Sequence, residues 1–474
     1  MDLRLNRTGA GRIFDKQLPV FNIFYPSQHD LEHGDVFTDG ICAVQDNDFS
    51  QTKSVALYFH FPFCDTICNF CPFTRGKYTD HQIITDYLAA LCKEVRSKNA
   101  TGKLFTLPVS AIFVGGGTPS LLTAEEIRVF GQLVHQNFNL AGLREFSFEC
   151  EVKSVTEDKV IALRDIGVTN ARFGLQTFDP YWRDMFDLTA SIEQIYAAAA
   201  LFERHIRYTS FDILYGMNGQ SPEMFERDLE KAVDVGNSLI DVYPLDNVVT
   251  QTRLHEKTKA AGHAPLTAEM RHEMNGMLRA FMRSRGFLPH NGHGYVQASK
   301  TECDRDPVVT RDYTFDYHNH VYGYHGFEVV GFGVNAISIL KEKVLTNPNN
   351  RRSYIDQLMK NGQVSTQLSR HSREVDASRS LVTRLPYHGY VSRAEVDWDR
   401  MPAETLSALH QLYDAGLVED CGPEILLTRQ GWEWYVNLMY FMMPLSQRKI
   451  LDGFIVHSLG QPGRELTTSQ VVFS

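Results

Sequence analysis

Short apolar runs alternate with stretches of helical spacing from Val55 to about Pro244. The predicted strands are Val55–His60, Ser110–Val114, Glu145–Cys150, Asn170–Leu175, Thr209–Leu214 and Leu239–Tyr243. The predicted helices between them are Asp80–Arg96, Thr123–Gln136, Thr156–Ile166, Ser191–Arg204 and Ser221–Val235. Such alternation is typical of βα units around a parallel sheet. The pattern therefore predicts an α/β fold with a partial, TIM-like barrel of six units, short of a closed eight-fold barrel.

Residues 267 to 285 are predicted to form one more helix, which Thr267 can cap and Gly286 can end. Its stripe of Met270, Met274, Met277 and Phe281 is more typical of core packing than of a cofactor site. After about residue 370, a different pattern predicts a small helical domain with a short hairpin, similar to a winged helix: Arg379–Thr383, Arg393–Glu395, Ala403–Ala415 and Ile425–Thr428.

These patterns divide the chain into four expected regions. They are an N-terminal extension (1–50), the partial barrel with a cysteine loop (51–250), a segment that completes the barrel and covers the substrate (251–370), and the C-terminal α+β domain (371–474).

Composition and charge narrow the functional classes. The net charge of -10 and the pI near 6.0 argue against a surface that neutralises nucleic-acid phosphates. No secretory signal and no apolar run of about 20 residues is evident, so we expect a cytoplasmic protein without a membrane span. Three of the eight cysteines fall within eight positions, which suits a metal site in a reducing compartment better than a disulfide framework.

The clustered cysteines, Cys64, Cys68 and Cys71, follow the first predicted strand with C-x3-C-x2-C spacing. A loop of this length can surround one iron–sulfur cubane, for which a full protein ligand set would be four thiolates. Three thiolates leave one iron open to a substrate or cofactor. The alternative, a structural zinc site, would need a fourth ligand, for which His60 would have to leave its strand.

A glycine segment, Gly115–Ser120, follows the second predicted strand. Three successive glycines let the backbone approach a ligand closely, so the segment could contact a bound amino acid through its carbonyl and amide groups. Alone such a triplet is usually a turn, but its position behind the cysteine loop favours a binding role.

The cysteine spacing, with Phe70 before the last cysteine, resembles that of radical S-adenosylmethionine (SAM) enzymes. The resemblance implies that Cys64, Cys68 and Cys71 hold a 4Fe-4S cluster whose open iron chelates the amino and carboxylate groups of SAM. It also implies reductive cleavage of SAM to a carbon radical, with electrons from a reducing protein such as flavodoxin or ferredoxin.

Further motifs are similar to the oxygen-independent coproporphyrinogen III oxidase (HemN-like) family over roughly residues 50 to 440. They are Tyr58, the cysteine loop, Gly115–Ser120, Glu149, Gln176, Asp212, Gly331–Ser338 and Leu427–Gly431. The resemblance implies that Tyr58, Gly117 and Glu149 lie beside the cluster-bound SAM. It places Phe70, Thr118, Gln176, Asp212 and Ile337 around the SAM sites, some near a second SAM molecule.

Tyr58, Gln176 and Asp212 are the expected catalytic residues. The alternative for Glu149, Gln176 and Asp212 is that each satisfies backbone groups at the end of the barrel or caps a helix. The alternative for Tyr58 is packing inside the barrel.

Two departures from the family concern the substrate. Family members that oxidise coproporphyrinogen carry a cysteine where this chain has Phe73, and an arginine where it has Leu188. An arginine would be a natural partner for a substrate carboxylate, because its planar fork binds carboxylates bidentately. Arg183 is near enough in sequence to be a substitute.

The departures favour the two-SAM (class C) methyltransferases and cyclopropanases, which modify an sp2 carbon of a small, often aromatic, substrate. The alternatives are oxidative decarboxylation of coproporphyrinogen III, and anaerobic haem degradation or haem delivery by a chaperone. A DNA-associated regulator is a weaker alternative, since residues 401–416 contain no Lys or Arg. Fold analogy alone does not separate these activities.

One aromatic and histidine-rich stretch, Tyr313–Phe327, could contact a flat aromatic substrate or a haem. His290, Asn291 and His293 form a second polar group that could face the same cavity. The alternative is that the stretch is a loop packed beneath the C-terminal domain.

Overall fold

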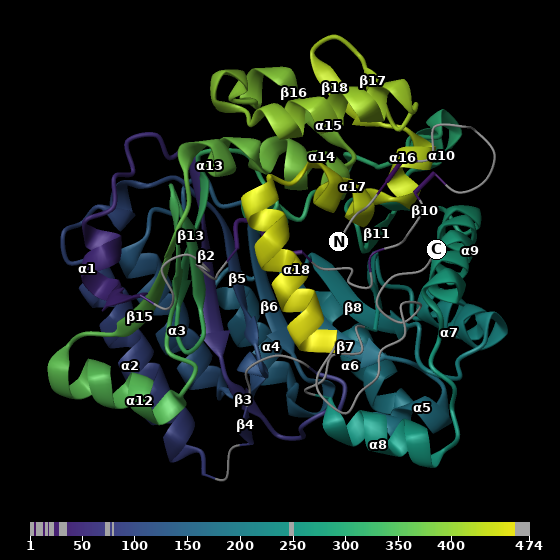
Figure 1. Cartoon of the computed structure of the whole chain (residues 1–474). Helices are drawn as coiled ribbons and strands as arrows, with labels where there is room; N and C mark the ends of the chain where they lie inside the picture. The colour runs from purple at the N-terminus through teal and green to yellow at the C-terminus, as the bar shows by residue number, and fades with distance from the viewer. Residues whose placement is uncertain are drawn as a thin grey trace.

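One large twisted sheet organises the molecule. The computed structural model describes residues 4–5, 13–14, 18, 23–27, 36–71, 76–77, 80–245 and 251–459. Within these residues, thirteen strands form the sheet in the order β1-β15-β14-β13-β12-β2-β5-β6-β7-β8-β9-β11-β10 (Figure 1). None of the helices in these ranges is both long and apolar enough to span a bilayer.

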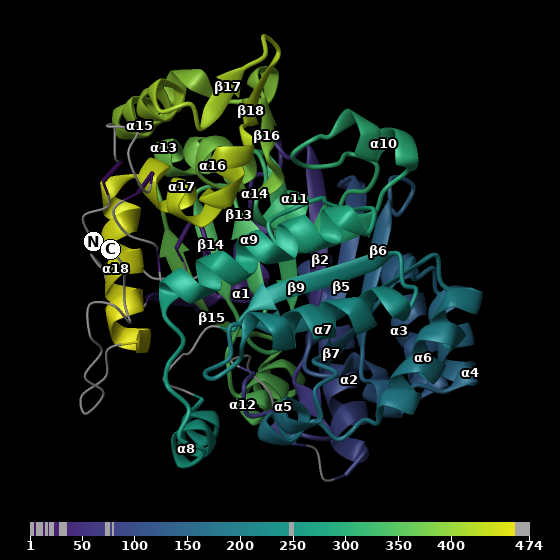
Figure 2. The same cartoon turned by 90° about the vertical axis from the view of Figure 1, so that its right-hand side faces the viewer.

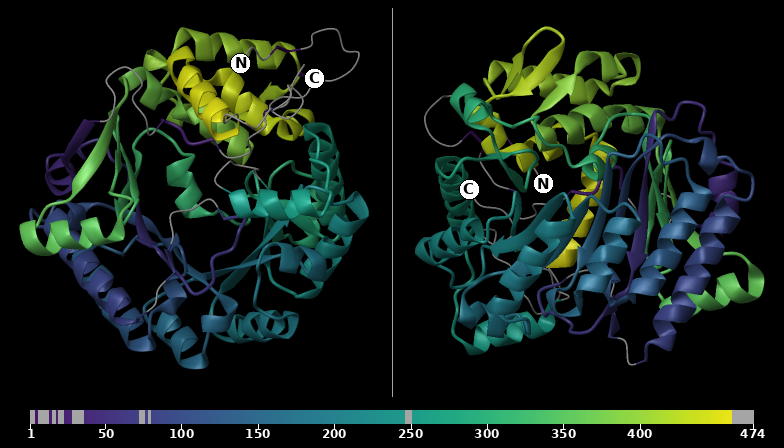
Figure 3. Two further views of the ribbon diagram at one scale, coloured as in Figure 1. Left: turned by 60° about the horizontal axis from the view of Figure 1, so that its bottom comes forward. Right: turned by 180° about the vertical axis from the view of Figure 1, so that it is seen from behind.

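The six predicted strands are confirmed and are adjacent and parallel in chain order. They are β2 (Ser54–Phe61), β5 (Val109–Gly116), β6 (Glu145–Cys150), β7 (Asn170–Gln176), β8 (Tyr208–Tyr215) and β9 (Leu239–Pro244). The predicted helices are α2 (Gln82–Lys98), α3 (Ala124–Asn137), α4 (Glu157–Asp165), α6 (Ile192–His205) and α7 (Pro222–Asp234). Capping boxes begin α3 at Thr123 and α6 at Ser191. These helices cover the outer face of the curved sheet (Figure 3).

The sheet extends beyond the six predicted units on both sides. A seventh parallel strand, β12 (Phe327–Phe332), pairs with β2, although nearly the whole barrel lies between them in sequence. The remaining strands are β1 (Val36–Asp39), β10 (Phe287–Pro289), β11 (Gly294–Gln297), β13 (Ile337–Leu340), β14 (Lys343–Thr346) and β15 (Ser365–Arg370). These six pair antiparallel. The segment after residue 250 therefore enlarges the barrel sheet.

Helix α9 (Ala268–Ser284) confirms the helix predicted over residues 267 to 285. Thr267 caps it by accepting a hydrogen bond from the Met270 amide. Met274 and Phe281 are buried in the main core, whereas Met270 is 39% exposed. The methionine stripe is thus core packing over all but its first turn.

The C-terminal region has its own core, above the sheet in Figure 1. The hairpin of β17 (Val418–Asp420) and β18 (Glu424–Leu427) is joined by β16 (Tyr390–Ser392). Its helices are α13 (Arg373–Arg379), α14 (Leu385–His388), α15 (Ala403–Asp414), α16 (Arg429–Glu433), α17 (Tyr435–Met442) and α18 (Leu445–Leu459). Helix α18 lies on the side of the sheet opposite α3, α4 and α6 (Figure 2). The expected winged-helix-like arrangement of helices and a short hairpin is observed.

Described residues of the N-terminal extension pack on distant parts of the chain. Leu18 and Tyr25 belong to the C-terminal core, and the Tyr25 hydroxyl donates to the Val375 carbonyl. Strand β1 adds to the edge of the main sheet by pairing with β15. These contacts join the N-terminal extension to the barrel sheet and to the C-terminal region. The domain boundaries at residues 50, 250 and 370 therefore remain predictions.

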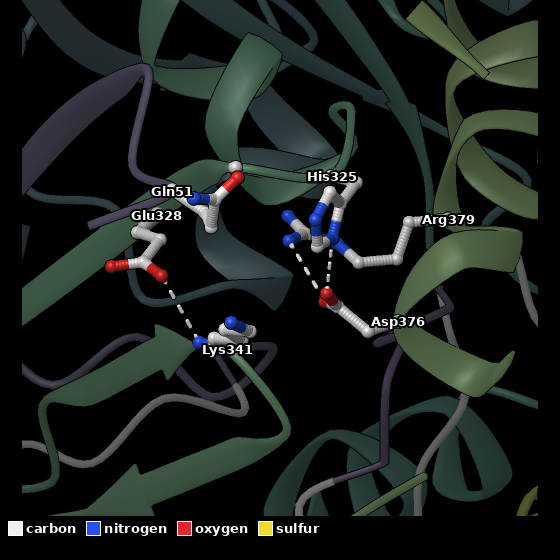
Figure 4. A pocket seen from close by; sticks show the side chains of 7 residues that line it. Gln51, His325, Glu328, Lys341, Asp376 and Arg379 are labelled. Carbon is white, nitrogen blue, oxygen red and sulfur yellow. Dashed lines mark hydrogen bonds and ion pairs between the residues drawn. The ribbon is translucent and has the colours of Figure 1, made fainter. Parts of the chain in front are cut away.

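A buried polar cluster joins the C-terminal region to the barrel (Figure 4). Asp376 of α13 binds His325 Nδ1 at 2.5 Å, and the Arg379 guanidinium donates to the carbonyls of His320 and Phe327. His320 belongs to α11 (Asp316–Val321), a short helix that contacts β2, β5 and β12. The stretch 313–327, for which a packed loop was the alternative, therefore contains a helix that the C-terminal region holds in place.

The remaining elements connect these parts. They are α1 (Gly40–Gln45), β3 (Phe63–Cys64), β4 (Gly76–Lys77), α5 (Pro180–Met185), α8 (Thr252–Ala260), α10 (Lys300–Arg305) and α12 (Arg351–Asp356).

Candidate active site

The cysteine loop begins where β2 ends and lies against α5. Cys64 is buried in β3, and Cys68 and Cys71 are half-buried. Asn69, between these two, donates its side-chain amide to the Met185 carbonyl at 2.7 Å. Phe70 packs on Phe186, with ring centroids 4.9 Å apart. Asn69 and Phe70 thus attach the loop to the end of α5.

The glycine segment packs directly beneath the cysteine loop. The amide groups of Gly117 and Thr118 donate to the carbonyls of Phe61 and Phe63, at 2.8 and 2.6 Å. A Cβ atom at Gly117 would lie 2.5 Å from the Phe63 carbonyl oxygen, so only glycine fits there. Both amides are thus bonded to Phe61 of β2 and Phe63 of β3, and binding of a ligand by amides of the segment stays a prediction. A contact between the segment's carbonyl groups and SAM remains a prediction.

Glu149 closes β6 next to this segment. Its carboxylate accepts a hydrogen bond from the Gly116 amide at 2.9 Å. Burial raises the pKa of Glu149 to about 7, against the opposing effects of that hydrogen bond and of Arg172. The charge of Glu149 therefore depends on what is bound beside it.

Asp212 lies on β8, two strands from Glu149. Burial also raises the pKa of Asp212; Arg172 opposes the shift, and Asp241 and Glu149 reinforce it. The structure therefore brings Glu149 and Asp212 together at one end of the barrel, as expected for side chains that follow parallel strands.

Gln176 ends β7 in a strained conformation. Its φ of 73° lies in the left-handed region, which non-glycine residues rarely adopt. The Gln176 Oε1 atom is buried and has no hydrogen-bond partner among the described residues. Backbone strain and an unsatisfied polar atom at a strand end are typical of binding sites.

Aromatic side chains form the inner surface opposite these polar groups. Tyr58 stacks on Phe113 and Tyr317, with centroid distances of 6.1 and 5.9 Å. Ile337 packs in the same small apolar cluster as Tyr58 and Tyr317. Burial raises the pKa of Tyr58 and Tyr317, yet all four side chains keep accessible surface. The four side chains therefore leave accessible surface inside the barrel, and the space that they border is referred to as the cavity.

Imidazole and phenol groups continue the inner surface toward the C-terminal region. The His293 ring packs on Tyr243 at 4.8 Å and reaches the Tyr435 hydroxyl at 3.3 Å. His318 Nδ1 is 3.0 Å from the Tyr387 hydroxyl. Burial lowers the pKa of His293 to about 4 and the pKa of His318 well below its usual value, so both rings are neutral at pH 7.

A buried ion pair lies below the strand-end carboxyl groups and was missed by sequence reasoning. Arg172 of β7 pairs with Asp241 of β9, and Asp241 also accepts a hydrogen bond from Ser210 of β8. Arg172 lies four residues before Gln176 on β7, but a register shift between Gly174 and Gln176 breaks the period of two, so strand periodicity could not have indicated it. The partner Asp241 could not be assigned from sequence.

The two departures from the family pattern have different outcomes. Leu188 packs in an apolar cluster with Phe70 and Tyr243. Arg183 does not replace the missing arginine, because its guanidinium donates to the backbone carbonyls of Leu175, Thr177 and Ala190. Phe73 lies outside the described residues.

The residues present suit a cluster and SAM. Three thiol side chains occupy one short loop, the glycine segment leaves no room for side chains beneath it, and the unsatisfied Gln176 Oε1 lies at the neighbouring strand end. Within the described ranges, no three His, Cys, Asp or Glu side chains converge on one metal ion. In a cubane, by contrast, each thiolate binds a different iron.

Comparison with known proteins agrees with this donor set. A family model described as the radical SAM superfamily matches residues 58–232. The oxygen-independent coproporphyrinogen III oxidase of Paracoccus denitrificans is 28% identical over 300 residues, which cover 62% of this chain and 62% of that protein. The chain thus aligns with less than two thirds of that relative.

Other relatives align over longer spans. The anaerobilin synthase of Escherichia coli O157:H7 is 24% identical, with 85% of this chain and 86% of that protein covered. The haem chaperone HemW of Bacillus subtilis is 23% identical, with 79% and 95% covered. The solved structure of Escherichia coli coproporphyrinogen III oxidase (HemN), described as a radical SAM enzyme, superposes with a TM-score of 0.71. It is 20% identical and covers 89% of this chain and 96% of its own.

The fold and the relatives agree with the cysteine loop on one identification. A 4Fe-4S cluster and SAM are the cofactors of this group of proteins. Residues 58–232 form a radical SAM domain, the chain has the HemN-like fold, and oxygen-independent coproporphyrinogen III oxidases are among its relatives.

Proposed function

We propose that the protein is a radical SAM enzyme that acts on a tetrapyrrole, and that the ring of a haem is its target rather than a propionate side chain. The observation that carries the proposal is the stack of Tyr58, Phe113 and Tyr317 inside the barrel, together with the buried, neutral imidazoles of His293 and His318. Stacking surfaces suit a planar macrocycle, and a neutral imidazole can bind iron.

The relatives support a tetrapyrrole substrate over the methyl or methylene transfer that we expected first. Their names include coproporphyrinogen III oxidase, anaerobilin synthase and haem chaperone. Coproporphyrinogen decarboxylation requires a propionate held at the reacting carbon. Where the family has an arginine, this chain has the apolar residue Leu188. The nearby Arg183 cannot replace it, because its guanidinium donates to backbone carbonyls. Reaction at the ring is therefore favoured over decarboxylation.

Each predicted site residue has a role in the proposed function. Cys64, Cys68 and Cys71 would hold the cluster, and Tyr58, Gly117 and Glu149 would border its SAM. Phe70, Thr118, Gln176, Asp212 and Ile337 would surround the remaining SAM contacts. Bound there, cluster and SAM supply a strongly reactive carbon radical. Closure of the cavity by α11 and the C-terminal region would exclude water during the reaction.

The test is anaerobic turnover of the reconstituted enzyme with methyl-deuterated SAM, a low-potential reductant, and either haem or coproporphyrinogen III. The proposal predicts loss of the haem absorption band, an open-chain product by mass spectrometry, and 5′-deoxyadenosine. Carbon dioxide from coproporphyrinogen with unchanged haem would assign the decarboxylase instead. Haem that binds stoichiometrically and stays intact would assign a chaperone. Deuterium from the SAM methyl group in the haem product would show that the enzyme transfers a methyl or methylene group as well as opening the ring.

A further inference from the structure

Arg172 is a cation inside the barrel, at the base of the cavity. It is only 6% exposed, and its guanidinium lies 4.4 Å from the centroid of the Phe315 ring. Its Nη2 atom donates to Asp241, which Ser210 holds from the other side. Asp241 is the one side-chain acceptor that the described residues give this guanidinium, so other N–H groups of the fork are left for a ligand.

Two further carboxyl groups flank the Arg172–Asp241 ion pair. Glu149 is the register partner of Arg172 on β6, and Asp212 follows on β8. Burial raises the pKa of both acids. Burial would lower the pKa of Arg172, but Asp241 and the neighbouring acidic groups outweigh that effect, so the pKa of Arg172 is also raised. The raised pKa values reduce the negative charge that Glu149 and Asp212 place around the Arg172–Asp241 pair near pH 7. An incoming anion would therefore meet the guanidinium N–H groups that Asp241 does not occupy.

The other arginine near the site cannot take this role. Arg183 points into backbone carbonyls, and the family's arginine position is Leu188. Arg172 lies instead on β7, four residues before the strained Gln176. A carboxylate held by Arg172 would lie deeper in the barrel than one held at Leu188, which is on the segment after α5.

From this geometry we infer that Arg172 is the carboxylate anchor of the cavity. Its ligand is either the amino-acid carboxylate of SAM or a propionate of the tetrapyrrole, and the second source rests on the proposed function. In both cases Asp241 and Ser210 fix the guanidinium before the ligand arrives, and Phe315 fixes its plane. Arg172 contacts the ligand, whereas Asp241 and Ser210 are positioning residues.

The test compares each ligand with its uncharged counterpart on the cluster-reconstituted protein, without reductant. Equilibrium binding would be measured for SAM, decarboxylated SAM, haem, and haem dimethyl ester. The variants are Arg172→Met and Arg172→Lys, and the control is Arg144→Met. Arg144 also forms an ion pair, with Asp316, but its side chain is 60% exposed.

We expect the wild-type protein to prefer one carboxylate ligand over its counterpart by at least about tenfold. Arg172→Met should reduce that preference by weakening binding of the acid alone, Arg172→Lys should keep more of it, and Arg144→Met should keep all of it. If the preference lies with SAM, SAM supplies the carboxylate; if it lies with haem, the propionate does.

An unchanged preference in Arg172→Met would overturn the inference. Should that variant fail to fold, an unchanged preference in Arg172→Lys would overturn it equally, because lysine lacks the planar fork. Failure of haem to bind the wild-type protein would contradict the proposed function but leave the SAM comparison decisive for Arg172.

Discussion

Tyr317 of α11 stacks on Tyr58 of β2, with ring centroids 5.9 Å apart and planes inclined by 29°. The two residues are separated by most of the barrel sequence, and the contact exists because α11 enters the concave side of the sheet. Both rings also stack on Phe113. Three aromatic rings from separate elements therefore make one continuous surface beside Glu149.

Tyr317→Ala should weaken ligand binding in the cavity, since it removes one ring of this surface. Aromatic pairs contribute roughly 0.5–1.5 kcal/mol beyond burial, so we expect affinity for haem to fall by roughly two- to tenfold. Tyr317→Phe should bind nearly as wild type, because it keeps the ring. Titration of the reconstituted protein with haem would measure both. Equal losses in the two variants would show that the hydroxyl, not stacking, matters.

Glu149 should make the stability of the protein fall as the pH rises. Burial raises its pKa from the ordinary value to about 7, so the folded state binds this proton more tightly than the unfolded state. The contribution is present below the unfolded pKa near 4.3 and is lost as pH rises through about 7. Urea denaturation between about pH 5 and pH 8 should show a shallower decline for Glu149→Gln. Identical slopes would refute this.

Sequence periodicity located the regular parts of this fold well. The six βα units alternate locally, and their strands pair in chain order, so their neighbours could be predicted. Strand β12 could not, because it pairs with β2 across a long separation in sequence. Helix α11 is a single short turn rich in polar and aromatic residues, and its Asp316–Val321 segment has no apolar repeat.

The candidate site was predictable where residues follow strands. Glu149, Gln176 and Asp212 lie in the C-terminal halves of three neighbouring parallel strands, which places them toward the same end of the barrel. The use of the glycine amides was not predictable, since their acceptors are the Phe61 and Phe63 carbonyls. Nor could the sequence show that Arg183 is directed at its own backbone. Hydrogen-bond partners depend on tertiary packing that the local pattern does not specify.

Gly117→Ala should disrupt cluster assembly. The added methyl group would lie 2.5 Å from the Phe63 carbonyl oxygen and 2.8 Å from the Phe63 nitrogen, which are backbone atoms beside Cys64. Iron and sulfide content after reconstitution should fall by about half or more, given the rigidity of close-packed interiors. Gly276→Ala is the control, since its Cβ would meet nothing within 4 Å. A full cluster in Gly117→Ala would contradict the packing described.

Lys98→Met should strongly destabilise the fold. Lys98 and Glu94 form a fully buried ion pair at 2.7 Å, and Lys98 also donates to the Gly331 carbonyl. Removing one partner of a buried pair costs about 3–5 kcal/mol, because the other charge remains buried. Urea denaturation would measure the loss.

Arg128→Met is the matched control for Lys98→Met. Arg128 pairs with Glu125 on an exposed helix surface at 3.8 Å, so its loss should cost about 0–1 kcal/mol. Similar costs for the two variants would show that burial does not set the strength of the Lys98 contact.

The central claim, that the cysteine loop carries a cluster that cleaves SAM, is tested most directly by 5′-deoxyadenosine formation in wild type and Cys68→Ala under reducing, anaerobic conditions. The Cys421→Ser variant, altered at an exposed cysteine, serves as control. We predict product from wild type and Cys421→Ser, and none from Cys68→Ala. Undiminished SAM cleavage by Cys68→Ala would contradict the account.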